Sequence, residues 1–102
     1  MRNSTYRQPR ISRDEAETLA IDVLGFLAAD ETRLAAFLRI TGLSLADIRK
    51  EAASPEFLAG VFDFLLSDDS LLLVFAGHKN LDPNVIGAAR RALMPNDTME
   101  NY

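Results

Sequence analysis

The chain has 102 residues, a net charge of −4 and 48% apolar residues, which is typical of one domain with a single core. It contains no cysteine, and this excludes disulfides, thiolate metal sites and a cysteine nucleophile. The N-terminal segment is positively charged but no apolar segment follows it, and no apolar run approaches the roughly 18 residues of a membrane helix. We therefore expect a cytoplasmic protein without a membrane partner.

The basic and acidic residues are unevenly distributed along the chain. Four arginines precede the first acidic residue, Asp14, and the rest of the chain carries seven basic residues against all fifteen acidic ones. We expect residues 1–11 to form a flexible basic arm, residues 12–94 a single helical domain and residues 95–102 a mobile tail. The alternative is an arm that binds an anionic partner, but the acidic body disfavours broad contact with phosphates.

Leucine and alanine recur at helical spacing, and β-branched residues are too scattered to build alternating strands, so we predict helices throughout. The predicted helix starts are marked by residues whose side-chain oxygens can accept backbone hydrogen bonds: Ser12, Asp30, Ser44, Ser54, Asp68 and Asp82. Glu15 completes a capping box with Ser12, Gly42 can end the second helix in the left-handed conformation, and the last helix should end before Pro95. The sequence therefore predicts an all-α fold, a compact orthogonal bundle of five to six short helices around one core.

The apolar residues indicate which helix faces turn inward. Between residues 57 and 66 they repeat at intervals of three and four, which is the period of a helix rather than of a strand. In the third helix we expect Leu45, Ile48 and Ala52 to face the core. The segment from Leu71 to Ala76 is apolar on every side, and we therefore predict that it is the central element, enclosed by the others.

The two halves of the chain resemble each other at an offset of 38 positions. Aligning residues 23–48 with residues 61–86 gives eight identities in twenty-six positions, where a composition this biased gives roughly one in ten. Asp30 then aligns with Asp68, and Phe37 with Phe75. Two explanations fit: an internal duplication of a three-helix unit, or the patterning that amphipathic helices share.

Residues suited to catalysis are few. The single histidine, His78, falls at a predicted helix end, where a positive imidazole would interact favourably with the helix dipole. Asp68 and Asp69 are adjacent in a predicted cap, where neighbouring side chains diverge, and no phosphate-binding glycine loop or calcium-loop spacing occurs. We expect no enzymatic activity, no catalytic residue, no cofactor and no metal site.

One alternative function is DNA binding through a helix-turn-helix. Residues 34–52 and residues 75–93 each have the pattern of helix, turn and helix, in which the second helix enters the major groove. The candidate contacts are Arg49, Lys50, Arg90 and Arg91. Generic helix packing produces the same pattern, and nucleic acid is therefore the less favoured partner.

The preferred prediction is a non-enzymatic protein-protein interaction module. The first predicted helix carries a second apolar line that includes Ile21 and Leu24, and the fourth adds Phe57 and Phe64 to its main apolar face. Together these exceed what one small core readily encloses, and aromatic residues left at a surface mark a partner or self-association site. The alternative is that the six helices simply cover these residues.

Two segments, "FLAADETRLAAFLRITGL" and "SPEFLAGVFDFLLSDDSLLLVFAG", together resemble the family of domain of unknown function 3572, which comprises small, mostly alphaproteobacterial proteins. The resemblance extends from about Asp14 to Met94 and rests on the order of these segments rather than on a catalytic motif. It implies a compact helical domain in a bacterial cytoplasm and assigns no activity or site residues.

Overall fold

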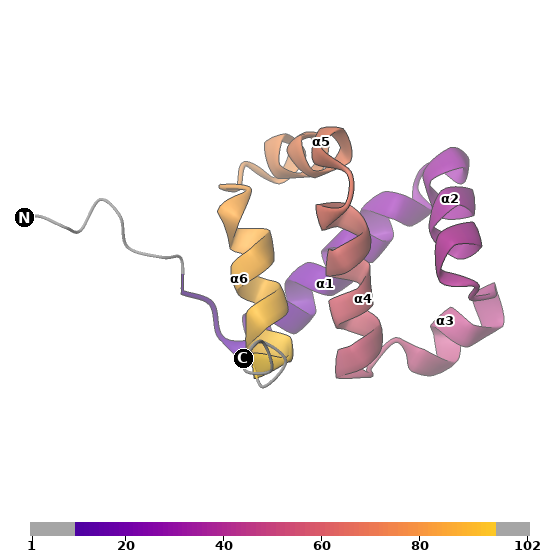
Figure 1. The fold of residues 1–102 in the computed structure, drawn as a ribbon, viewed down its shortest axis with the longest axis horizontal. Helices are drawn as coiled ribbons and strands as arrows, with labels where there is room; N and C mark the ends of the chain where they lie inside the picture. Colours follow the sequence, from indigo (N-terminus) through magenta and orange to yellow (C-terminus); the bar gives the residue numbers. More distant parts are fainter. Residues whose placement is uncertain (1–9, 96–102) are drawn as a thin grey trace, which may run out of the picture.

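Six helices and no strands make up residues 10–95, the part of the chain that the computed structural model describes (Figure 1). The helices are α1 (Arg13–Ala28), α2 (Glu31–Thr41), α3 (Leu45–Glu51), α4 (Pro55–Leu66), α5 (Asp69–Lys79) and α6 (Asn84–Leu93). In Figure 1 α1 crosses behind α4 and α6, α5 lies across one end of this group, and α2 and α3 lie on the side of α4 away from α6. The predicted all-α bundle of short helices is confirmed. The basic arm up to residue 9 and the tail from residue 96 lie outside the described residues.

The helices begin where the sequence predicts because local side chains satisfy their first backbone N–H groups. The backbone N–H of Ser12 donates to Glu15 Oε1 at 2.8 Å and that of Glu15 donates to Ser12 Oγ at 3.0 Å, which completes the predicted capping box of α1. Asp30, Ser54 and Asp68 accept backbone hydrogen bonds at the starts of α2, α4 and α5 in the same way. α3 also begins with a capping box.

The helix α6 begins one residue later than a cap at Asp82 would place it. The helix begins at Asn84 after Pro83, and the carboxylate of Asp82 accepts a hydrogen bond of 2.9 Å from the backbone N–H of Asn84. Asp82 therefore does the capping that the sequence predicts, although it lies one residue before the geometric cap position.

Two helices end in the left-handed conformation. Gly42 has φ +76° at the end of α2, as predicted, and Asn80 has φ +57° at the end of α5. These two residues are separated by the 38 positions that also separate the caps Asp30 and Asp68. However, α3 contributes no buried residue whereas α6 contributes four, so the internal duplication stays a prediction.

The core is organised around α4, which buries seven of its twelve residues against α1 and α6. A second contact joins α4 to α2, where the ring of Phe37 lies edge-on to Phe64 at 5.2 Å and to Phe57 at 6.3 Å. Edge-on aromatic pairs of this kind add to the stability gained from burial alone.

Two predictions about the core are wrong. The segment 71–76 is not the central element, because α5 packs on α4 at the edge of the bundle and leaves Leu73 60% and Val74 50% exposed. Leu45 does not face inward but is 57% exposed, and α3 reaches the core through Ile48. Both errors have the same cause, since apolar content does not say how many neighbours a helix will have.

No helix within the described part of the chain is long and apolar enough to cross a membrane.

Candidate functional site

The four residues predicted to form an interaction surface do not lie together on the surface. Ile21 is 46% exposed and Leu24 is partly buried, but Phe57 and Phe64 are buried. The prediction that these two phenylalanines are available to a partner is therefore wrong. The cause is Phe37, because its ring packs edge-on against both phenylalanines and covers the ring surfaces that we expected a partner to contact.

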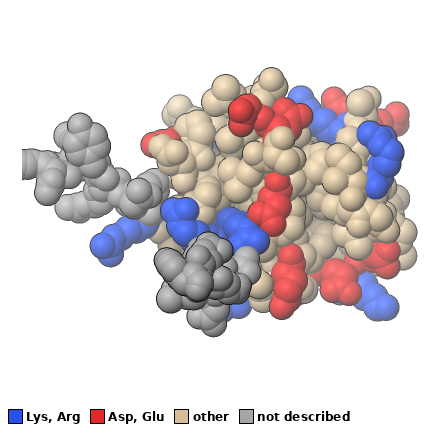
Figure 2. Space-filling view, viewed as in Figure 1, with Lys and Arg blue, Asp and Glu red and all other residues tan. Residues whose placement is uncertain are grey.

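The four candidate DNA contacts are also divided between two places. Arg49 and Lys50 lie on α3 and Arg90 and Arg91 on α6, at opposite sides of the bundle in Figure 1. Figure 2 shows acidic side chains over α4 between these helices. Arg90 donates to both carboxylate oxygens of Asp63 on α4, at 2.8 and 3.2 Å, so this arginine joins two core helices.

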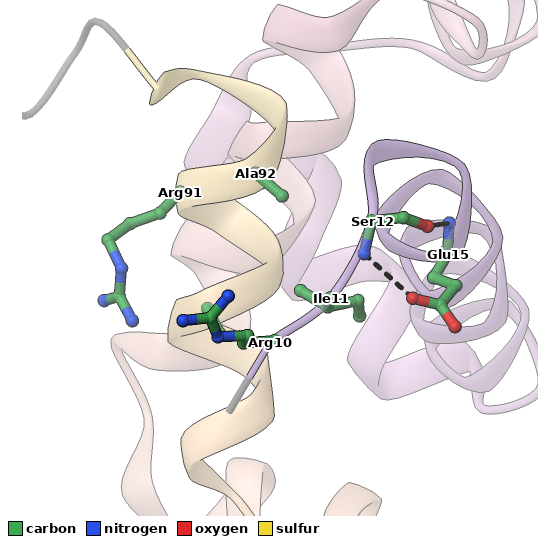
Figure 3. A pocket seen from close by; sticks show the side chains of 7 residues that line it. Arg10, Ile11, Ser12, Glu15, Arg91 and Ala92 are labelled. Atoms are coloured by element: carbon green, nitrogen blue, oxygen red, sulfur yellow. Dashed lines mark hydrogen bonds between the residues drawn. The ribbon is translucent and has the colours of Figure 1, made fainter. Parts of the chain in front are cut away.

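Arg91 lies beside a shallow hollow of about 830 Å³ between the start of α1 and α6 (Figure 3). Arg10 lines the same hollow, and the polar groups on its other side are Ser12 and Glu15. Both are already used by the capping box, and the backbone hydrogen bond from Ser12 lowers the pKa of the Glu15 carboxyl below its ordinary value. The carboxylate of Glu15 therefore caps the start of α1, and it would repel an anion attracted to this hollow by Arg10 and Arg91.

A second hollow lies between α1 and α5, and Arg33 from the first turn of α2 also lines it. We call it the α1–α5 groove. It has a volume of about 470 Å³ and is lined by Asp22, Gly25, Phe26, Ala29, Arg33, Val74, Phe75, His78 and Lys79. Residues 22, 25, 26 and 29 form one face of α1 and the turn after it, and residues 74, 75, 78 and 79 form one face of α5.

The floor of the α1–α5 groove is apolar. The ring of Phe26 lies edge-on to the buried ring of Phe75 at 5.2 Å. Val74 lies beside these rings and is half-exposed. The opposite wall, on the α1 side, is low because Gly25 and Ala29 carry little or no side chain. A Cβ atom built on Gly25 would meet no atom within 4 Å, so this wall borders open space. The groove can therefore receive an apolar side chain from outside.

The rim of the α1–α5 groove is rich in nitrogen donors. The guanidinium carbon of Arg33 lies 4.3 Å from the centroid of the Phe26 ring, a cation–π geometry, and the imidazole of His78 lies 6.2 Å from the same centroid. Lys79 Nζ pairs with Asp22 Oδ2 at 3.5 Å. Arg33 has no carboxylate partner among residues 10–95.

Sequence reasoning found only His78 in this groove and assigned it to the end of a helix. It does lie in the last turn of α5, as predicted, but its ring also faces Phe26. Phe26, Arg33 and Val74 were missed. The spacing of 22, 25, 26 and 29 and of 74, 75, 78 and 79 was the available signal, although it marks two helix faces without showing that they meet.

The described residues contain no group of three or more His, Asp or Glu side chains arranged to hold a metal ion, and none of their polar or charged residues is buried. Asp68 caps α5 through its carboxylate, as the sequence predicts, while Asp69 begins the helix.

Comparisons with known proteins identify a family. No curated protein and no solved structure matches the chain. A family model described as "Protein of unknown function (DUF3572)" matches residues 13–96, which include all six helices. This confirms the resemblance found in the sequence, and the chain belongs to the DUF3572 family.

Proposed function

We propose that this protein is a cytoplasmic, non-enzymatic interaction module that binds a segment of a partner protein in the α1–α5 groove. The observation that carries the proposal is the half-exposed Val74 beside Phe26, in a hollow with one low wall and a rim of polar groups. An apolar centre surrounded by polar groups is the general anatomy of a protein interface.

The energetics favour insertion of a side chain from the partner. Full burial of a leucine or phenylalanine side chain contributes about 1.5–3 kcal/mol. The groove volume of about 470 Å³ has room for such a side chain, and Phe26 and Phe75 already hold each other in place beneath it. The floor therefore needs little rearrangement, which keeps the cost of binding low.

The polar groups of the groove are arranged for binding rather than for proton transfer. Among residues 10–95, Asp22 is the only carboxylate that lines the groove, and it pairs with Lys79, while His78 faces an aromatic ring instead of an acid. In nucleophilic catalysis the general base lies within hydrogen-bonding distance of the nucleophile and is itself oriented by a third group. No described contact favours the alternative of DNA binding, since Arg90 is held by Asp63.

The test is capture of partners by two matched leucine variants. Gly25→Leu places a side chain in the groove, whereas Gly77→Leu adds one on α5 outside it. A Cβ at either glycine meets nothing within 4 Å, and leucine is a better helix former than glycine, so both variants should fold. Cross-linking and pull-down from native cells should recover the same proteins with the wild type and Gly77→Leu, and lose them with Gly25→Leu. Recovery by Gly25→Leu equal to that by the wild type would overturn the proposal, as would a wild type that captures nothing.

A further inference from the structure

We infer that the segment bound in the α1–α5 groove is acidic, with an apolar side chain beside Val74 and Phe26 and a flanking carboxylate paired with Arg33. This inference rests on the proposed function and names the chemistry of the partner.

The charge of the groove is opposite to that of the molecule. The whole chain has eleven basic and fifteen acidic residues and a net charge of −4. Among the described residues that line the groove, Arg33 and Lys79 are basic and Asp22 is acidic, which gives a net charge of +1 when His78 is counted as neutral, as it is in the whole chain. Lys79 pairs with Asp22, so the unpaired positive charge is that of Arg33. A positive site in a negative protein attracts an acidic segment and gives a basic one no partner.

Arg33 is the specific anchor for a carboxylate. Its guanidinium stacks on the Phe26 ring at 4.3 Å, and a guanidinium held by its face keeps the N–H groups at its edge available for other bonds. These edges form the planar fork that binds a carboxylate with two hydrogen bonds. The ion pairs among the described residues join Arg13 to Glu17, Lys79 to Asp22 and Arg90 to Asp63, and none of them involves Arg33.

The position of Arg33 couples the carboxylate to the apolar side chain. The guanidinium lies directly over Phe26, and Phe26 contacts Phe75 in the floor beside Val74. A carboxylate paired with Arg33 therefore lies next to the place where an apolar side chain enters. His78, whose ring also neighbours Phe26, supplies a further donor for a second carboxylate. The matching segment is one leucine or phenylalanine flanked by glutamate or aspartate.

The test compares three labelled peptides that differ only in the residues flanking one leucine: glutamate, glutamine or lysine. Fluorescence anisotropy at low salt should show the glutamate peptide binding about tenfold more tightly than the glutamine peptide, the effect of one charge-assisted pair. The lysine peptide should bind more weakly still. Added salt should reduce the advantage of glutamate because screening weakens exposed charge pairs.

Two arginine variants locate the effect. Arg33→Gln removes the guanidinium in the groove and should abolish the preference for glutamate. Arg39→Gln makes the same change on the same helix, at an exposed residue that does not line the groove, and should preserve the preference. Arginine and glutamine are similar helix formers, so neither variant should unfold α2.

The outcomes separate this inference from the proposed function. Equal affinity for all three peptides, tighter binding of the lysine peptide, or a glutamate preference that survives Arg33→Gln would overturn the inference. If partner capture is nevertheless lost in Gly25→Leu, the proposed function stands without it. Binding of the glutamate peptide that is unchanged in Gly25→Leu would place the segment elsewhere on the protein and overturn both.

Discussion

The aromatic contact between α2 and α4 allows a quantitative prediction of stability. Phe37 is 1% exposed, and its ring is edge-on to both Phe64 and Phe57. Replacing it with alanine removes a fully buried ring and leaves a cavity, for which the usual cost is about 3–5 kcal/mol. Because two edge-on pairs are lost together, we expect Phe37→Ala to lower the free energy of unfolding by about 4 kcal/mol.

This loss is large relative to the roughly 5–15 kcal/mol that stabilises a typical domain. The assay is urea denaturation followed by far-ultraviolet circular dichroism, since the chain contains no tryptophan to serve as a fluorescent reporter. With a denaturant dependence of about 1.5 kcal/mol per molar urea, the midpoint should fall by about 2.7 M.

The matched control is Leu45→Ala. The sequence predicts that Leu45 faces the core, but in the structure it is 57% exposed. Its replacement should therefore change the free energy of unfolding by no more than about 0.5 kcal/mol. The reasoning would be refuted if Phe37→Ala cost less than about 1.5 kcal/mol, or if the two variants were equally destabilised.

Further predictions concern helix ends and ion pairs. Gly42→Ala should destabilise the fold by about 1 kcal/mol because an alanine is strained at φ +76°. Gly77→Ala, inside α5 and facing open space, should stabilise the fold by about 0.5–1 kcal/mol. A higher melting temperature for Gly42→Ala, or a lower one for Gly77→Ala, would contradict these predictions. A double-mutant cycle on Asp63 and Arg90 should show a coupling of about 1 kcal/mol, and a value near zero would mean that the pair does not join α4 to α6. The hydrogen bond from Ser12 lowers the pKa of Glu15 in the folded state, so its contribution is present above the unfolded pKa and is lost as the pH falls through the folded pKa. Glu15→Gln should therefore lose less stability than the wild type between neutral and acidic pH, and equal losses in urea midpoints across that range would count against the capping geometry.

Local side chains set the positions at which the helices begin and end. The cap of α1 is a pair of hydrogen bonds between residues three positions apart, and Asp30 and Asp68 bond to N–H groups two or three residues away. Gly42 meets a local need for a positive φ. These interactions involve neighbours along the chain, so their energies are the same whatever the rest of the fold does, and the sequence alone predicts them.

Which helix becomes central was decided by tertiary packing. Both α4 and α5 have strongly apolar sequences, yet α4 lies between α1, α6 and α2 while α5 covers one edge and leaves Val74 half-exposed. Periodicity identifies an apolar face but does not state how many other helices will cover it. The same reason explains why Phe57 and Phe64 are buried, since only the fold brings Phe37 between them.

The α1–α5 groove depends entirely on the tertiary structure. Phe26, Arg33 and His78 belong to three different helices, and His78 lies 45 positions after Arg33 in the chain. Their proximity follows from the packing of α5 beside α1 through the rings of Phe26 and Phe75, which places an imidazole and a guanidinium against one ring. No local interaction between neighbouring residues specifies this packing, because it arises from the burial of Phe75 and Ala76 against the rest of the core.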